Sequence, residues 1–462
     1  MRGLDTLVAI ANGDISAREA CADSMARIAR CNQRVNAFTL TTRDRAFAEA
    51  DEVDKKRARG ERLPPLAGLP YAVKNLFDIE GETTLAGSKV NRTLPAAASD
   101  AFLVARMREA GAVLVGALNM DEYAYGFTTE NTHYGTTRNP HDLTCVAGGS
   151  SGGSGAAVAA ALVPVALGSD TNGSIRVPAS LCGVWGLKPT FGRLSRRGAY
   201  PFVHSLDHVG PMADSVGTLA LAYDALQGPD TLDSSCHATH AQPVAQTADP
   251  GVHGLRIGTL GGYFEEMAGP EARVAAQLAG RALSATGEVT WPDAELARAA
   301  AFIVTASEGG QLHLPILRSM KEEFEPLSVD RLIAGAMQPV AWYLAAQRFR
   351  RTYRERVMHL FKDWDVLIAP ATPVCATEIG TEWLDLGGQR HPNRAAMGLL
   401  TQPISFAGCP VVAAPMWPSG PKSLPVGVQL IAAPWNEDAC FRAARVLEVA
   451  GIARVQRPEY FL

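Results

Sequence analysis

Apolar and polar residues recur at helical spacing in the first part of the chain. Ser16 and Glu19 form a capping-box pattern, and apolar positions follow at helical spacing as far as Ile28. Residues 43–59 are heavily charged and predict a second helix with one solvated face. The chain is therefore expected to begin with helices over residues 4–60.

From about residue 63 the pattern changes to short apolar runs between helical segments. Apolar strands are predicted at 69–73, 112–115 and 163–167. Residues 270–360 are predicted to be mostly helical, with breaks at Pro315, Pro326 and Pro339. Further strands are predicted at 366–368, 411–414 and 427–430, before a closing helix at 437–450. This alternation predicts an α/β fold, with a mainly parallel or mixed central sheet sandwiched between layers of helices.

Composition narrows the class of protein. The chain has 462 residues, 19% charged side chains and a net charge of −4, which argues against a nucleic-acid-binding footprint. The eight cysteines are scattered without a CxxC pair, which indicates reduced thiols and no zinc or redox motif. The N-terminus lacks the pattern of a signal peptide, and no apolar run is long enough to span a bilayer. We therefore expect a cytoplasmic protein without membrane contact.

Ser174 is the first candidate nucleophile. It ends the loop GSDTNGS, after the strand predicted at 163–167 and before a short helix. In such a loop the backbone N–H groups converge, and an oxyanion hole is expected from Thr171, Asn172, Gly173 and Ser174. Gly173 would help to aim these donors. Taken by itself, however, a serine before a helix is more often only an N-cap.

Ser150 and Ser151 lie in a second Gly/Ser loop, GGSSGGSG. A phosphate-binding loop is disfavoured because Ala156 follows the last glycine where a lysine is required. The segment also fits GxSxG with Ser151 as nucleophile, but that elbow needs a preceding strand and residues 139–145 are predicted to be loop. A flexible linker is disfavoured by the small-residue helix expected at 155–161.

Lys74 is the third candidate. Most lysines are charged surface residues, but Lys74 directly follows the apolar strand at 69–73. Burial there would lower its pKa and produce a neutral base.

Taken together, these segments resemble the amidase signature family. The matching elements are GLPYAVKNLFD, GGSSGGSGAAVAA and DTNGSIRVPASLCG, with FAGCPVVAAP and LPVGVQLIAAPWNED matching more loosely. The resemblance implies a Ser-Ser-Lys relay. Ser174 would form the acyl-enzyme, Ser150 would follow a cis peptide bond and bridge the two, and Lys74 would accept the proton.

The resemblance also implies one domain over 1–462. Its parts would be N-terminal helices at 1–62, a signature core at 63–215, and a C-terminal half with a helical insertion at 255–462. Asp170 and Arg176 flank the nucleophile loop and are candidates for a bracing ion pair, or for an ordinary surface pair.

Position 172 departs from the family pattern. Many members have glycine there, whereas this chain has Asn172. Asparagine tolerates left-handed backbone geometry, so the hole is still expected to form, and its amide is a candidate to reach the substrate.

Two branches of the family match the remaining motifs. One is the A subunit of tRNA-dependent amidotransferases, which would act as a glutaminase. The other hydrolyses 1-carboxybiuret to urea-1,3-dicarboxylate and ammonia in cyanuric acid breakdown, and residues 300–400 favour it. A catalytically inactive scaffold is disfavoured because Lys74, Ser150 and Ser174 are all present.

The favoured branch is expected to act on a small acidic amide. Candidate substrate-binding residues are Asn172, Tyr125, Thr128 and Arg318. Arg331, Arg390 and Arg394 are further candidates for the carboxylate, although an arginine is more often solvated. The resemblance implies a small helical partner subunit like the amidotransferase C subunit, or a homodimer. It implies no metal, no cofactor and no nucleic-acid partner.

Overall fold

The computed structural model describes residues 2–237, 241–245, 251–420, 423–458 and 461. Within these residues, eleven strands form one sheet in the order β1-β3-β2-β6-β8-β7-β14-β15-β11-β9-β10. The strands are β1 (Phe38–Thr41), β2 (Pro70–Lys74), β3 (Val113–Leu118), β6 (Val165–Asp170), β7 (Trp185–Lys188), β8 (His208–Ala213), β9 (Ile257–Leu260), β10 (Gly287–Val289), β11 (Val366–Pro370), β14 (Val411–Ala414) and β15 (Val428–Ile431). Two small sheets pair β4 (Arg138–Asn139) with β5 (Asp142–Val146), and β12 (Trp383–Leu386) with β13 (Gln389–Pro392).

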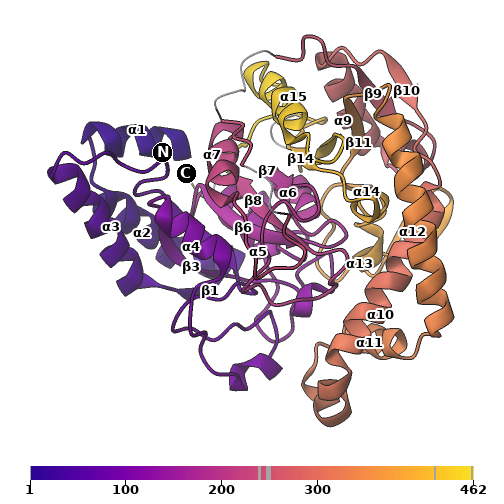
Figure 1. The fold of residues 1–462 in the computed structure, drawn as a ribbon, viewed down its shortest axis with the longest axis horizontal. Helices are drawn as coiled ribbons and strands as arrows, with labels where there is room; N and C mark the ends of the chain where they lie inside the picture. The colour runs from indigo at the N-terminus through magenta and orange to yellow at the C-terminus, as the bar shows by residue number, and fades with distance from the viewer. Residues whose placement is uncertain (1, 238–240, 246–250, 421–422, 459–460, 462) are drawn as a thin grey trace.

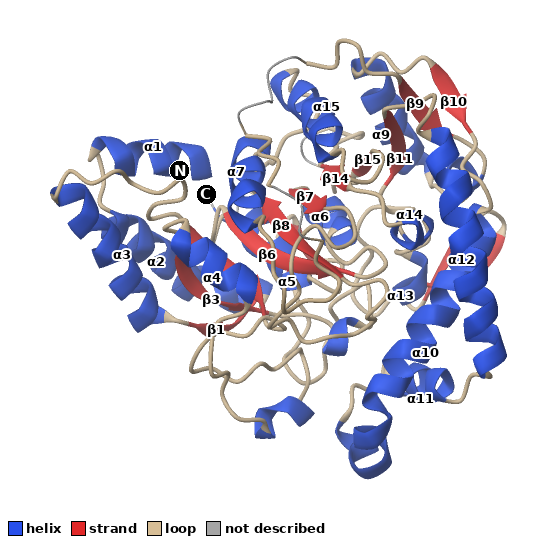
Figure 2. Cartoon of the chain, viewed as in Figure 1, coloured by secondary structure: helices blue, strands red, loops and turns tan. Residues whose placement is uncertain are grey.

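The central sheet is mixed. β2 runs parallel to both β3 and β6, whereas β8, β7, β14 and β15 pair with their neighbours in antiparallel fashion. The central strands are buried along their whole length, which explains why they are read in the sequence as unbroken apolar runs. Helices cover the sheet in Figure 2, so the predicted α/β sandwich is confirmed.

Helices occupy both flanks of the sheet. They are α1 (Gly3–Asn12), α2 (Ala17–Val35), α3 (Arg43–Ala58), α4 (Phe102–Glu109), α5 (Gly152–Ala159), α6 (Arg176–Cys182), α7 (Val216–Leu226), α8 (Tyr263–Glu266), α9 (Pro270–Ala282), α10 (Ala294–Met320), α11 (Val329–Ala336), α12 (Val340–Leu360), α13 (Asn393–Ala396), α14 (Gln402–Ala407) and α15 (Glu437–Val449). In Figure 1, α1 to α3 lie at one end, and α10 and α12 lie side by side at the other. No helix of the described ranges carries an apolar stretch that could traverse a bilayer.

The sequence pattern located most elements but missed some boundaries. The capping box of Ser16 and Glu19 is present, as predicted. Pro315 lies inside α10, so the predicted break there is wrong. A proline removes one backbone hydrogen bond, but His313 and Leu317 on either side of it are buried, and their packing keeps the helix continuous. The predicted loop at 139–145 is also wrong, because β5 begins at Asp142.

Candidate active site

Lys74 is the last residue of β2, at the carboxyl end of a central strand. Its side chain is fully buried, and Nζ donates hydrogen bonds to Ser150 Oγ at 2.7 Å and to Ser169 Oγ at 2.9 Å. Burial lowers the pKa of Lys74 to about 7, although nearby carboxylates, that of Asp121 foremost, act in the opposite direction. A large fraction of Lys74 is therefore neutral near pH 7, which a general base requires.

The Gly/Ser loop at the start of α5 holds Ser150 against this lysine. The Gly149–Ser150 peptide bond is cis, as the resemblance implies. Ser151 makes hydrogen bonds to the backbone. Its N–H donates to the Ser174 carbonyl, and its hydroxyl donates to the Ser169 carbonyl. Because Ser151 Oγ donates to the backbone and β5 belongs to a small separate sheet, the GxSxG alternative loses its support.

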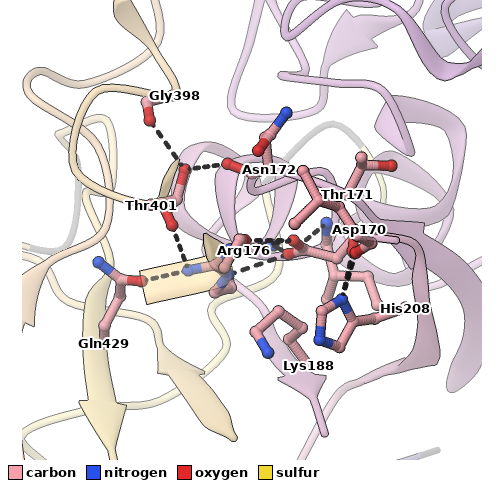
Figure 3. A network of polar contacts seen from close by, with 12 residues as sticks. Asp170, Thr171, Asn172, Arg176, Lys188, His208, Gly398, Thr401 and Gln429 are labelled. Atoms are coloured by element: carbon pink, nitrogen blue, oxygen red, sulfur yellow. Dashed lines mark hydrogen bonds and ion pairs between the residues drawn. The ribbon is translucent and has the colours of Figure 1, made fainter. Parts of the chain in front are cut away.

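A buried ion pair stabilises the nucleophile loop. Arg176 Nε and Nη2 donate to the two carboxylate oxygens of Asp170, each at 2.9 Å, and both side chains are fully buried. Arg176 Nη1 also reaches the Thr401 carbonyl and Gln429 Oε1 (Figure 3). Burial raises the pKa of Asp170, but the Arg176 guanidinium reverses this and holds it well below its usual range. The expected bracing pair is therefore present, and it lies in the core rather than on the surface.

The loop presents unused backbone donors beside the nucleophile. In the part of the chain that the structure describes, the N–H groups of Asn172, Gly173 and Ser174 donate no hydrogen bond. Gly173 has a φ of 141°, and a Cβ there would meet Thr401 Oγ1 at 2.2 Å, so only glycine fits. Asn172 itself is not in the left-handed region, so the backbone tolerance expected of asparagine is not needed. Free, aimed N–H groups are what an oxyanion hole consists of.

Ser174 is the last residue of this loop. It is 2% exposed, and its hydroxyl makes no hydrogen bond to any described residue. The direct bond to Ser150 Oγ that a relay uses is thus not formed here. Hydrogen bonds of this kind are often completed only when substrate binds.

Helix α10 closes the site from the other side. Thr305 and Gly309 lie on the same face of this helix because they are four residues apart. Thr305 Oγ1 accepts a hydrogen bond from Asn172 Nδ2 at 2.8 Å. A Cβ on Gly309 would meet the Phe202 ring at 2.7 Å, so that ring packs directly on the helix. The ring of Phe202 in turn lies 4.9 Å from that of Tyr125.

The contacts that lead from α10 through Phe202 to Tyr125 end at a positively charged side chain. The Arg331 guanidinium, on α11, stacks over the Tyr125 ring at 3.9 Å. Within the described ranges, this guanidinium has no carboxylate partner, and the buried Tyr125 hydroxyl has no hydrogen-bond partner. An unpaired arginine and a free hydroxyl are suited to receive a carboxylate.

A buried pair of acids holds α11 in this position. The Glu325 N–H, just before α11, donates to Glu122 Oε2 at 2.7 Å, and Glu325 Oε2 accepts from the Thr132 N–H and hydroxyl. Burial raises the pKa of Glu122 to about 7. Because Glu122 lies three residues before Tyr125, the clamp fixes α11 to the loop on which Arg331 stacks.

The other substrate-binding candidates lie elsewhere. Thr128 Oγ1 accepts a long bond of 3.4 Å from Arg394, which is itself paired with the buried Asp121 at 3.0 Å. Arg318 is exposed in the last turn of α10. Arg390 stacks over Trp383 on the exposed β12–β13 hairpin. Of the arginines considered, only Arg331 contacts another predicted site residue without being paired to an acid of the described chain.

A cavity of about 250 Å³ reaches the site and is lined by Ser169, Thr171 and Phe202, among others. A larger one, of about 610 Å³, lies between α9 and the β9–β10 edge, and its lining includes neither Ser169, the partner of Lys74, nor any described residue of the nucleophile loop. We therefore associate the smaller cavity with the chemistry.

Sequence reasoning missed two side chains that the fold brings to the site. Ser169, the second partner of Lys74, lies in the loop GSDTNGS and could have been found from its spacing to Ser174. Thr305 gave no signal, because it lies in a helix far away in the sequence.

The arrangement provides every part that acyl transfer needs. Ser174 offers a hydroxyl, Lys74 a base of pKa about 7, and Ser150 a hydroxyl in contact with that base. The free N–H groups can stabilise an oxyanion.

Comparison with known proteins shows the family of the chain. The Amidase family model matches residues 19–441. AtzE of Pseudomonas sp. (strain ADP), which belongs to a 1-carboxybiuret hydrolase, is 66% identical over 99% of this chain and 100% of its own length. The A subunit of the glutamyl-tRNA(Gln) amidotransferase of Chromohalobacter salexigens is 35% identical over 97% of this chain and 96% of its own length.

Solved structures show the same fold. An s-triazine catabolic enzyme, described as part of a vestigial protein complex, superposes with a TM-score of 0.98 at 66% identity, over 99% of this chain and 100% of that one. A 6-aminohexanoate cyclic dimer hydrolase complexed with substrate gives a TM-score of 0.87 at 29% identity, over 100% and 99%. The chain belongs to the amidase signature family of hydrolases, which act on the C–N bonds of linear amides.

Proposed function

We propose that this chain hydrolyses 1-carboxybiuret to urea-1,3-dicarboxylate and ammonia through an acyl-enzyme on Ser174. The observation that carries the chemistry is the buried Lys74, of pKa about 7, bonded to Ser150 Oγ beneath the Ser174 loop. The 66% identity to AtzE of the carboxybiuret hydrolase supports the choice of substrate.

In the proposed acylation step, Ser174 Oγ attacks the terminal carbamoyl carbon. Its proton passes to Ser150 Oγ as the Ser150 proton passes to neutral Lys74. The C–N bond then breaks, the leaving nitrogen takes a proton back from Lys74 through Ser150, and ammonia departs. The Lys74–Ser150 distance of 2.7 Å supports the second transfer, and rotation of the unbonded Ser174 hydroxyl completes the first.

The N–H groups of residues 171–174 form the proposed oxyanion hole. They would stabilise the negative charge that develops on the carbonyl oxygen both when Ser174 attacks and when water releases the product. The rigid Asp170–Arg176 brace supports this role, since it leaves the loop little freedom to reorganise.

We assign the substrate carboxylate to Arg331 and Tyr125. The unpaired Arg331 guanidinium and the free Tyr125 hydroxyl support this assignment over the exposed Arg318. Asn172, which faces α10, would contact the middle of the substrate. Thr128 has a structural role in the proposal, since its hydroxyl accepts from Arg394.

We further propose a cytoplasmic, single-domain protein that assembles with a small helical subunit, with itself, or with both. The solved relative with a TM-score of 0.98 is described together with a vestigial protein complex, which supports a partner. This chain also exposes large apolar side chains around the start of α12, including Met337, Val340 and Trp342.

The decisive experiment is ammonia release by the purified chain from carboxybiuret, biuret, glutamine and simple amides. We expect turnover of carboxybiuret, and loss of at least about a thousandfold in kcat for Ser174→Ala, because the acyl-forming atom is gone. Ser151→Ala is the matched control, since its hydroxyl bonds to the backbone and is outside the relay. It is expected to retain most of the activity.

Other results of this assay would lead to different conclusions. Turnover of glutamine instead of carboxybiuret would move the chain to the amidotransferase branch. Full activity in Ser174→Ala would refute the relay. If the chain is silent alone and active after addition of cell extract, a partner subunit is required for catalysis.

A further inference from the structure

The side-chain amide of Asn172 is buried, and one of its two polar atoms has no hydrogen-bond partner among the described residues. The residue is 5% exposed, and its side chain reaches from the nucleophile loop to α10. Nδ2 donates to Thr305 Oγ1 at 2.8 Å, but Oδ1 is buried and has no partner in the described part of the chain. A buried carbonyl without a donor is unfavourable by about 1–3 kcal/mol, so native proteins usually provide one.

The surroundings fix this amide in place. The Asn172 backbone carbonyl accepts a bond from Thr401 Oγ1 at 2.6 Å (Figure 3). The following Gly173 is packed against the same threonine. With the main chain held by Thr401 and Nδ2 held by Thr305, no described residue supplies a donor to Oδ1, and a bound molecule can provide it.

Asn172 lies two residues before Ser174, inside the loop whose N–H groups face the reacting carbonyl. With a substrate carbonyl in the proposed oxyanion hole, an acceptor at this place would be next to the atom that follows the carbonyl carbon in the acyl part of the substrate. In a ureide that atom is an N–H, whereas in an ordinary carboxamide, glutamine included, it is a CH₂ group.

We propose that Asn172 Oδ1 accepts a hydrogen bond from the substrate N–H beside the scissile carbonyl, and that Thr305 is the positioning residue that orients it. The pair would select ureides over carboxamides of the same shape. This inference rests on the proposed function, because it concerns the same site. A site that bonds a substrate N–H disfavours the analogue lacking it, since its own buried group is then left unpaired.

Biuret and malonamide provide a matched pair of probes, because they differ only by N–H against CH₂ at the central position. Their dissociation constants can be measured by calorimetric titration of the Ser174→Ala protein, in which they are not consumed. We expect biuret to bind at least about tenfold more tightly than malonamide. Adding Asn172→Ala or Thr305→Val is expected to reduce this preference to about twofold or less.

Thr305→Ser retains the hydroxyl and should keep the preference. Ser307→Ala, on the same helix but bonded to Gln338, is the matched control and should also keep it. Equal binding of the two probes, no measurable binding, or a preference that survives Asn172→Ala would overturn the inference. A preference that follows these variants in a protein that does not turn over carboxybiuret, either alone or with added cell extract, would instead refute the proposed function and leave ureide recognition standing.

Discussion

At the scale of single residues, the proposed chemistry depends on one buried amine. Lys74 lies at the end of a central strand, and burial is the main reason that its pKa falls to about 7. The same position also lets it contact two serine hydroxyls. An exposed lysine would stay protonated at neutral pH and could not act as the base.

We expect kcat/KM to follow the neutral fraction of Lys74. Protonation removes the base, so activity should fall about tenfold per pH unit below about pH 7 and level off above it. The pH–rate profile of the wild type measures this directly. Glu122→Gln is the control, because Glu122 also has a pKa of about 7 but lies outside the relay. A profile that is flat in the wild type, or lost in Glu122→Gln, would contradict the assignment to Lys74.

At the scale of elements, α10 and α11 complete a site that the signature segments leave open. Thr305 on α10 reaches the nucleophile loop, and Arg331 on α11 reaches Tyr125. The carboxyl pair of Glu122 and Glu325 fixes α11 to the core through a backbone N–H. In the proposed mechanism, the helical insertion would bind the substrate carboxylate, and the strands and loops would hold the reacting groups.

Arg331→Ala is expected to lower kcat/KM for carboxybiuret by about tenfold to a hundredfold, mainly through KM. A charge-assisted hydrogen bond to the carboxylate would be lost, which corresponds to about 1.5–3 kcal/mol. Biuret, which has no carboxylate, should be affected much less. Arg318→Ala is the matched control on the exposed end of α10. If Arg318→Ala had the larger effect, the carboxylate site would have to be moved there.

At the scale of the whole molecule, one buried arginine ties distant segments together. Arg176 follows the nucleophile loop, and its guanidinium contacts Asp170, Thr401 and Gln429. Asp170 ends β6 and Gln429 lies in β15, on different halves of a sheet that continues from β1 to β10, and Thr401 directly precedes α14. We therefore expect the chain to unfold as one unit.

Arg176→Ala tests this expectation. It leaves the Asp170 carboxylate buried and unpaired, which should lower the free energy of unfolding by about 3–5 kcal/mol. Differential scanning calorimetry should show a single transition at a lower Tm. Arg351→Ala, whose side chain is 87% exposed, should leave Tm unchanged. Separate transitions for the two halves would contradict the single-domain proposal.

Much of this protein was predictable from its sequence. The central strands are buried on both faces, so β2, β11 and β14 appear as unbroken apolar runs. The two serines proposed for the relay lie in glycine-rich motifs, because close backbone approach leaves no room for a Cβ at Gly149 or Gly173. The continuation of α10 through Pro315 was not predictable, since packing on both sides of the proline outweighs its local preference.

The sequence by itself indicated the α/β architecture, because periodicity is a local property. Its motifs, through their resemblance to a family, also gave the three residues of the proposed relay and the reaction class. The tertiary structure alone decided how Asn172 meets Thr305, which arginine stands unpaired beside Tyr125, and how far the pKa of Lys74 falls. These features depend on burial and on contacts between segments far apart along the chain. No local pattern encodes them.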